Sequence, residues 1–266
     1  MRSLSLAASG LAFAFAPLGA LASGTLVFSD QKAEAGVRHQ LGPSLVGNAG
    51  LTQSFAGTDF VATQNRVYNA SVFSGRGYAH HGATFLTPGS VIGAPFSGAI
   101  LDACTSAEIY SSGIGPYVYE EAYGMANGVI EFTLSAPMNW SWIGGWQGNT
   151  HNTGSYNEVL AVHELIEIGS GFNHVNQTRS SVNGAGNWVE FFSRGGSLGP
   201  GTYRLTWSHE SYVLGGHTPY GFFPTGYGGA PLVSCINSEF RIWNIPAPGS
   251  LALLGMGGLF ATRRRR

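Results

Sequence analysis

The sequence predicts an all-β fold: an antiparallel β-sandwich, jelly-roll-like, flanked by an N-terminal signal peptide and a short C-terminal transmembrane helix. Two observations on composition and one on pattern predict the sandwich. Glycine is frequent, with 40 residues, and aromatic side chains make up 12% of the chain. Charged side chains make up only 10%, against about 25% in ordinary soluble domains. Several segments alternate apolar and polar residues, and turns rich in glycine and proline separate them, which favours half-buried strands over helices.

Residues 1–22 form the predicted signal peptide. A single early charge, Arg2, precedes a long apolar run that glycine and proline interrupt, which disfavours a permanent membrane anchor. Ala20 and Ala22 are the small residues that signal peptidase requires before its cut. We therefore expect export by way of signal peptidase, with a mature chain that starts at Ser23.

Residues 23–244 form the predicted extracellular domain, one β-sandwich of about nine to eleven strands. The clearest strand candidates alternate apolar and polar side chains through residues 128–137, 139–146, 156–169, 201–210 and 237–245. Shorter candidates cover residues 25–29, 66–73, 78–86 and 107–113. The segment 156–169 is long enough for a helix, but its β-branched residues and the glycines that end it favour a strand.

The charge distribution excludes nucleic acid as a partner. Arg2 and the four arginines 263–266 supply five of the thirteen basic residues, which leaves eight basic against fourteen acidic side chains in between. Nucleic-acid binding requires a basic face, and a body with a net charge of −6 does not offer one.

Cys104 and Cys235 are the two cysteines of the chain. Export removes the protein from a reducing environment, so we expect a disulfide between them in preference to two buried thiols. Neither cysteine has the spacing of a zinc site.

No pattern in the sequence indicates a catalytic, metal or cofactor site. His163 and Glu167 begin and end the segment HELIE, but on a strand they lie about 13 Å apart, too far to share a metal ion. Glutamates are present that could act as a glycoside hydrolase pair, although nothing ties any two together.

Two aromatic residues are the candidate carbohydrate contacts. Trp146 and Tyr156 flank the polar segment QGNTHNTGS. Aromatic rings can stack on sugar rings while neighbouring amides bind hydroxyl groups. The alternative is that the tryptophans fill the core of the sandwich.

Residues 245–266 have three consecutive parts. Pro246, Ala247, Pro248 and Gly249 come first, a short apolar run follows, and Arg263, Arg264, Arg265 and Arg266 close the chain. Arginines at the end of an apolar run stay on the cytoplasmic side of a membrane, so the body would lie outside. This layout resembles the PEP-CTERM sorting signal, with Ala247 where that family has glutamate. The resemblance implies processing by an exosortase and a bacterium that makes an extracellular polysaccharide.

These observations predict a non-enzymatic protein that is exported, held transiently in the membrane by its C-terminal helix, and delivered to the cell surface or extracellular matrix. Its role would be structural or adhesive, with extracellular polysaccharide as a candidate partner. The alternative is a secreted polysaccharide-acting hydrolase or a carbohydrate-binding module.

Overall fold

The computed structural model describes residues 24–41, 44–69, 73–87, 91–111, 118–150, 156–182, 186–216 and 232–244. These residues form an all-β structure of two antiparallel sheets, which confirms the predicted sandwich. The strands are β1 (Gly24–Leu41), β2 (Ser44–Ser54), β3 (Phe60–Asn69), β4 (Phe73–Phe85), β5 (Pro95–Phe96), β6 (Gly98–Ser111), β7 (Val118–Leu134), β8 (Met138–Thr150), β9 (Tyr156–Glu167), β10 (Asn173–Val182), β11 (Gly186–Leu198), β12 (Gly201–Gly216) and β13 (Leu232–Asn244).

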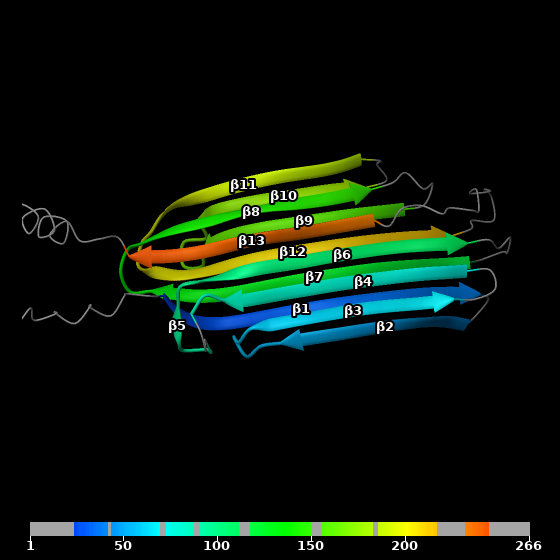
Figure 1. Cartoon of the computed structure of the whole chain (residues 1–266), viewed down its shortest axis with the longest axis horizontal. Helices are drawn as coiled ribbons and strands as arrows, with labels where there is room; N and C mark the ends of the chain where they lie inside the picture. The colour runs from blue at the N-terminus through cyan, green and yellow to red at the C-terminus, as the bar shows by residue number, and fades with distance from the viewer. Residues whose placement is uncertain are drawn as a thin grey trace, which may run out of the picture.

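The two sheets lie face to face. The first sheet has the order β10-β9-β12-β7-β1-β2, with β5 paired to β1, and the second has the order β11-β8-β13-β6-β4-β3. Strand β1 packs over β4, and β7 packs over β6. Hairpins β1–β2, β3–β4 and β9–β10 stay within one sheet, whereas several other connections pass from sheet to sheet. Apart from the short β5, the strands run along the long axis of the molecule (Figure 1).

The alternation read from the sequence corresponds to burial between the sheets. In β7, Ile130 and Phe132 are buried and Glu131 between them is half-buried. In β12, Leu205 and Trp207 are fully buried in the same way. The segment that begins at Tyr156 is strand β9 and not a helix, as its β-branched residues predicted.

Other strands differ from the prediction. The expected strand over residues 66–73 belongs to two strands, because β3 ends at Asn69 and β4 begins at Phe73. Strands β2, β10 and β11 did not stand out in the sequence. They are edge or near-edge strands with many exposed positions, so their apolar alternation is weak.

Aromatic rings fill the sandwich near β5. Phe96 contacts Phe132 with ring centroids 5.0 Å apart, and Phe132 lies 5.7 Å from Phe240. These phenylalanines come from β5, β7 and β13, so they join both sheets. Each fully buried ring contributes about 1.5–3 kcal/mol relative to an exposed one, which makes this cluster a main source of stability.

Glycines make room for aromatic rings on the paired strand. Trp207 pairs with Gly128 and Phe191 pairs with Gly145, and in both cases the ring lies over the glycine. The same arrangement holds for Tyr123 over Gly36 and for Trp188 over Gly148. Such cross-strand pairs shield the glycine backbone and orient the ring, so these glycines are part of the packing.

The two sheets approach each other closely at Gly77 of β4 and Gly124 of β7. A Cβ atom on Gly124 would overlap the carbonyl oxygen of Tyr78 and would lie 3.1 Å from that of Ser106, both in the opposite sheet. A Cβ atom on Gly77 would likewise overlap the carbonyl oxygens of Tyr123 and Gly36. Backbone therefore contacts backbone here, where sheets ordinarily stand about 10 Å apart.

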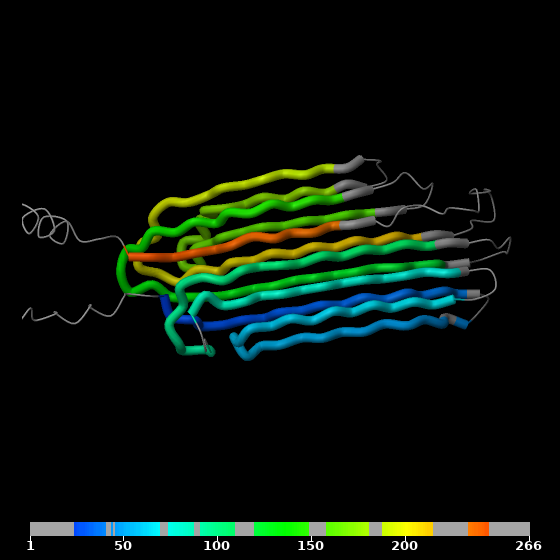
Figure 2. The backbone as a smooth tube through the Cα atoms, in the orientation of Figure 1, coloured from blue at the N-terminus to red at the C-terminus, as the bar shows by residue number. Residues whose placement is uncertain are grey.

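The first and last described residues lie at the same end of the sandwich (Figure 2). A Cβ atom on Gly24, at the start of β1, would lie 2.9 Å from the side chain of Ile242 in β13. The predicted signal peptide, with Ala20, Ala22 and Ser23, and the predicted sorting signal at 245–266 lie outside the described residues. Within the described ranges no helix is long and apolar enough to cross a membrane.

Candidate functional site

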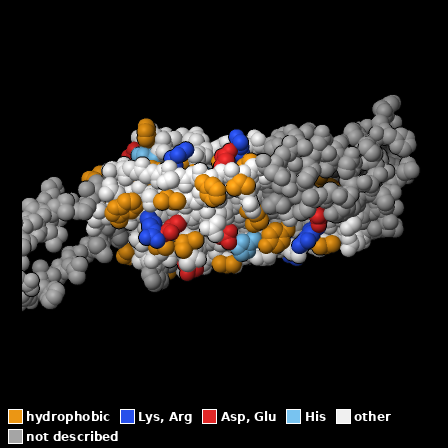
Figure 3. All heavy atoms as spheres, turned by 45° about the horizontal axis from the view of Figure 1, so that its top comes forward, with side chains coloured by type: hydrophobic (Ala, Val, Ile, Leu, Met, Phe, Trp, Pro, Cys, Tyr) orange, Lys and Arg blue, Asp and Glu red, His pale blue; other side chains and the backbone are white. Residues whose placement is uncertain are grey.

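A surface groove lies on the outer face of the second sheet. Its volume is about 920 Å³, within the range of about 300–1,000 Å³ that small-molecule sites occupy. We call it the outer groove; β6, β8, β11 and β13 line it, with Asp102, Cys104, Ile143, Gly144, Gly145, Trp146, Gln147, Val189, Phe191, Phe192, Ser193, Cys235, Ile236 and Asn237. Figure 3 shows one face of the molecule, on which hydrophobic side chains are scattered among several charged ones.

Phe191 forms the exposed aromatic side of the outer groove. It is 85% exposed, the highest value among the large exposed hydrophobic residues described. A Cβ atom on Gly145 would lie 3.1 Å from Cδ1 and Cε1 of this ring, so the ring leans over the glycine of the neighbouring strand. The glycine thus seats Phe191 while most of the ring surface faces solvent.

Polar side chains occupy the other side of the outer groove. Asn237 pairs with Gly145 on one side and with Asp102 on the other, so both follow Phe191 in one row across the sheet. Asp102 Oδ2 lies 3.5 Å from His80 Nε2, and His80 Nδ1 lies 2.9 Å from Thr63 Oγ1. This chain of contacts orients the Asp102 carboxylate beside the groove.

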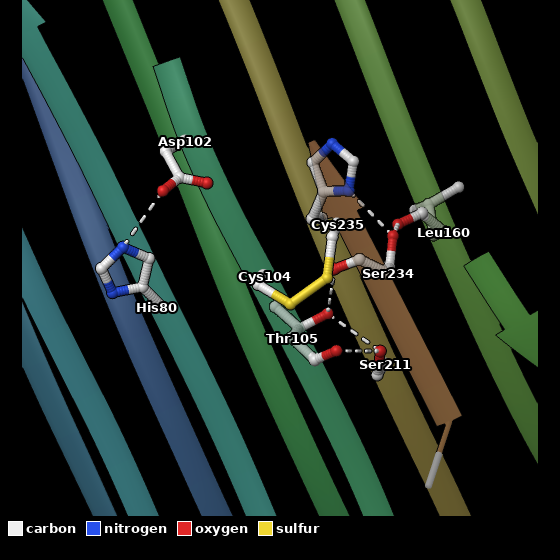
Figure 4. Close-up of a disulfide and its surroundings, with 9 residues drawn as sticks. His80, Asp102, Cys104, Thr105, Leu160, Ser211, Ser234 and Cys235 are labelled. Atoms are coloured by element: carbon white, nitrogen blue, oxygen red, sulfur yellow. Dashed lines mark hydrogen bonds and ion pairs between the residues drawn. A yellow bond between two sulfur atoms is a disulfide. The ribbon is translucent and has the colours of Figure 1, made fainter. Parts of the chain in front are cut away.

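The disulfide between Cys104 and Cys235 forms one end of the outer groove, and it confirms the predicted bond (Figure 4). The two cysteines are direct partners on β6 and β13. Their neighbours Thr105 and Ser234 point to the opposite face, into the sandwich. The bond therefore holds together the two central strands of the second sheet.

The structure separates the two predicted carbohydrate contacts. Trp146 is 4% exposed, and its Nε1 donates a hydrogen bond to Glu190 Oε2 over 3.0 Å. Its ring packs inside the sandwich, so the prediction of an exposed stacking surface at Trp146 is wrong. Tyr156 lies in β9 of the other sheet, paired with Leu214, and its side chain lies outside the described part. Phe191 did not stand out in the sequence, because the pair Phe191-Phe192 does not reveal which ring faces solvent.

A buried network of histidines lies between the sheets beneath the disulfide. His163 Nε2 and His209 Nε2 lie 3.0 Å apart, and His209 Nδ1 lies 2.8 Å from Ser234 Oγ. His81 Nε2 lies 2.6 Å from Gln31 Oε1. The three histidines are fully buried. The contact between the two Nε2 atoms is a hydrogen bond only when one of them carries no proton, so the pair must hold at least one neutral ring.

Tryptophan rings surround these histidines. Trp146 and Trp142 lie over His163 with centroid distances of 4.5 and 5.4 Å, and Trp207 stacks on His81 at 5.4 Å. Burial in this apolar setting lowers the pKa of His163 to about 3. Burial, with a smaller effect from His80, lowers the pKa of His81 to about 3 as well. Burial lowers the pKa of His209 well below its ordinary value, with smaller effects from His163 and His81. All three rings are therefore neutral near pH 7.

We expect acid to unfold this protein through the buried histidines. Because each folded-state pKa lies below the unfolded value of 6.5, the unfolded chain binds more protons at low pH. Stability is then fully present above about pH 6.5 and falls as pH drops toward 3, by up to about 1.4 kcal/mol per pH unit for each histidine. Urea denaturation between about pH 8 and 4 measures this slope.

Two variants separate the buried histidines from the rest of the protein. His209→Gln removes one buried titrating group and should flatten the slope. His80→Gln, at the partly exposed ring on the outer face, removes only the smaller of the two effects on the pKa of His81 and should change the slope much less than His209→Gln does. A denaturation midpoint that stays constant down to about pH 4 would contradict the assignment.

A second, smaller groove lies on the outer face of the first sheet. Its volume is about 390 Å³, and it is lined by Glu34, Arg38, Glu121, Tyr123, Met125, Glu158, Glu210, Ser211 and Tyr212. Among its carboxylates, Glu34 contacts Lys32 and Tyr123, Glu121 contacts Arg38, and Glu210 contacts Ser208. We call it the glutamate groove. Strands β1, β7, β9 and β12 line it.

Neither groove gathers metal ligands. Among the described residues, no group of three or more histidine, cysteine, aspartate or glutamate side chains is placed to hold a metal ion. His163 and Glu167, the ends of the HELIE segment, lie on one strand as expected, with His163 buried and Glu167 half-buried near its end.

Comparisons with known proteins do not identify a family. No family model matches the chain, and no curated protein matches it. Among solved structures, the chain is similar to one described as the structure of infectious bursal disease virus, Gx strain, at 11% identity and a TM-score of 0.20. That alignment covers 91% of this chain and 75% of the viral chain. A similarity this low supports no conclusion about fold or function.

Proposed function

We propose that this protein is exported and sorted to the cell surface or extracellular matrix, where it has a structural or adhesive role. The observation that carries the proposal is the position of the two described ends. Gly24 and Asn244 lie at one end of an elongated sandwich, whose longest strand of 18 residues spans about 60 Å. A body tethered by its C-terminal tail at that end would project its remaining length away from the membrane.

Two further features support this proposal. The disulfide crosslinks strands 131 residues apart in the sequence, and such bonds persist in oxidising compartments outside the cytoplasm. The tail 245–266 supplies the order of proline motif, apolar run and arginine cluster that resembles a PEP-CTERM signal. In this proposal an exosortase processes the tail after transient anchoring, and the jelly-roll-like body is released to the surface.

The arginine cluster provides the test of sorting. Replacing Arg263–Arg266 with glutamine removes the charges that hold the tail on the cytoplasmic side, so we expect loss of processing and of surface delivery. The measurement is mass spectrometry of the protein purified from its own cells. Without substitutions, the protein should have an N-terminus near Ser23 and should lack the terminal arginines. Arg194→Gln, at an exposed arginine of the body, is the matched control and should be processed normally. Recovery of the unchanged chain in the cytoplasm with both ends intact would refute the proposal.

The alternative function is a secreted polysaccharide-acting hydrolase, and the glutamate groove is the observation that favours it. A glycoside hydrolase needs two carboxyl groups about 5–9.5 Å apart on either side of the substrate bond. In the glutamate groove, Glu34 and Glu121 already bind cationic side chains. This engagement favours a binding or structural role over hydrolysis, and we keep the enzyme as the second candidate.

A further inference from the structure

The geometry of the outer groove points to a binding site for a neutral polysaccharide, with Phe191 as the stacking platform and Asn237, Asp102 and Gln147 as the hydroxyl-binding side chains. This inference rests on the proposed function in one respect, because an extracellular location is where the protein would meet such a polymer. It concerns residues of the second sheet that the sequence did not single out.

The first step is the platform. A sugar ring presents an apolar C–H face that packs on an aromatic ring, and the ring must be exposed and held in place to contribute. Phe191 meets both conditions, because it is 85% exposed and leans on Gly145. Val189 and Ile143, on the same face, extend the apolar surface on both sides of it.

The second step is the polar side. Moving across the sheet from Phe191, the row continues through Gly145 to Asn237 and then to Asp102. Glycine leaves an open floor between the ring and the amide, and two strand spacings separate Phe191 from Asn237, about 10 Å. An aromatic side and a polar side at this separation match the apolar face and the hydroxyl edge of a sugar ring. Gln147 adds a second amide one row away, beside the disulfide.

The third step is the charge of the ligand. Asp102 carries the only formal charge among the residues that line the outer groove. An acidic polysaccharide needs lysine or arginine partners for its carboxylates, and none lines this groove. The Asp102 carboxylate, held by His80, accepts hydrogen bonds from hydroxyl groups. The site is therefore suited to a neutral polymer.

Binding assays with defined oligosaccharides test the inference. The exported protein is titrated by calorimetry with cellohexaose and with a hexamer of N-acetylglucosamine as neutral probes, and with a hexamer of galacturonic acid as the anionic probe. We expect at least one neutral probe to bind and the anionic probe not to bind. Phe191→Ala should weaken binding about tenfold or more, because the stacking surface is lost. Phe191→Trp should retain binding, and Asn237→Ala should weaken it.

The matched control is Val61→Ala. Val61 is another exposed hydrophobic residue on the same outer face, at the edge strand β3 and far from the outer groove. The Val61→Ala variant should bind the neutral oligosaccharides as tightly as the protein without substitutions does. Folding of Phe191→Ala is checked by its urea midpoint, which should not move because the side chain is exposed.

Three outcomes would overturn the inference. They are no binding of either neutral probe up to about 10 mM, unchanged binding by Phe191→Ala, or equal binding of the galacturonate hexamer. Light scattering tests whether a second copy of the chain occupies the groove instead of a polysaccharide. The groove would be assigned to self-association if the protein binds no sugar and its mass rises with concentration. Phe191→Ala would then abolish that rise in mass. None of these results bears on the sorting proposal, which the arginine-cluster variant tests separately.

Discussion

Replacing Gly124 with alanine is expected to lower the free energy of unfolding by about 3 kcal/mol or more, at the upper end of the cost of overpacking. The added Cβ would overlap the Tyr78 carbonyl oxygen in the opposite sheet. Backbone in a paired strand cannot rotate away as a side chain can, so the sheets must separate or shift. Urea denaturation of the purified exported protein measures the loss.

Gly82→Ala is the control for this prediction. Gly82 is also buried, in β4, which pairs with a strand on each side, but its added Cβ would find the nearest atoms 3.6–3.9 Å away, which is ordinary contact. Alanine restricts the unfolded chain more than glycine does, so this variant should be neutral or slightly more stable. Equal destabilisation by both substitutions would contradict this prediction. It would show that the clash with the opposite sheet at Gly124 does not cause the loss of stability.

Removing the disulfide is expected to have the largest effect on stability. The bond joins residues 131 apart in the sequence, and closing a loop of that length restricts the unfolded chain by about 4–5 kcal/mol in the chain-entropy model. The double variant Cys104→Ser/Cys235→Ser should lose about this much of its free energy of unfolding. The measurement is urea denaturation with and without a reducing agent.

The reducing agent supplies the internal control. It should destabilise the unchanged protein by a similar amount and leave the double variant unaffected. A double variant within about 1 kcal/mol of the unchanged protein would mean that the bond contributes little to folding. The outer groove would then keep its shape without the disulfide, since β6 and β13 also pair through their backbones.

Much of the fold was predictable because burial in a sandwich has a local signature. Residues 128–134 and 201–210 alternate so clearly that their strands, β7 and β12, are evident from the sequence. The edge strand β11 was not evident. Its sequence includes Phe191-Phe192 and Gly195-Gly196, and exposed positions on an edge leave the alternation incomplete.

The candidate site was predicted less well than the fold. The sequence favoured Trp146 as a stacking surface, but its position on β8 directs it inward onto His163. Adjacent residues on a strand face opposite sides, so the neighbour of a buried ring is exposed. Which of the two is buried depends on where the second sheet lies, and no local pattern reports that.

The sequence by itself determined the all-β class, the single pairing open to two cysteines, and the low charge of the body, because composition and period-two patterns are local properties. The tertiary structure alone decided three other features: the histidine pair His163–His209, the backbone contact at Gly124, and the row from Phe191 to Asp102. Each of these joins residues far apart in the chain through strand order and register. Register is set by the packing of whole sheets, so no single segment encodes it.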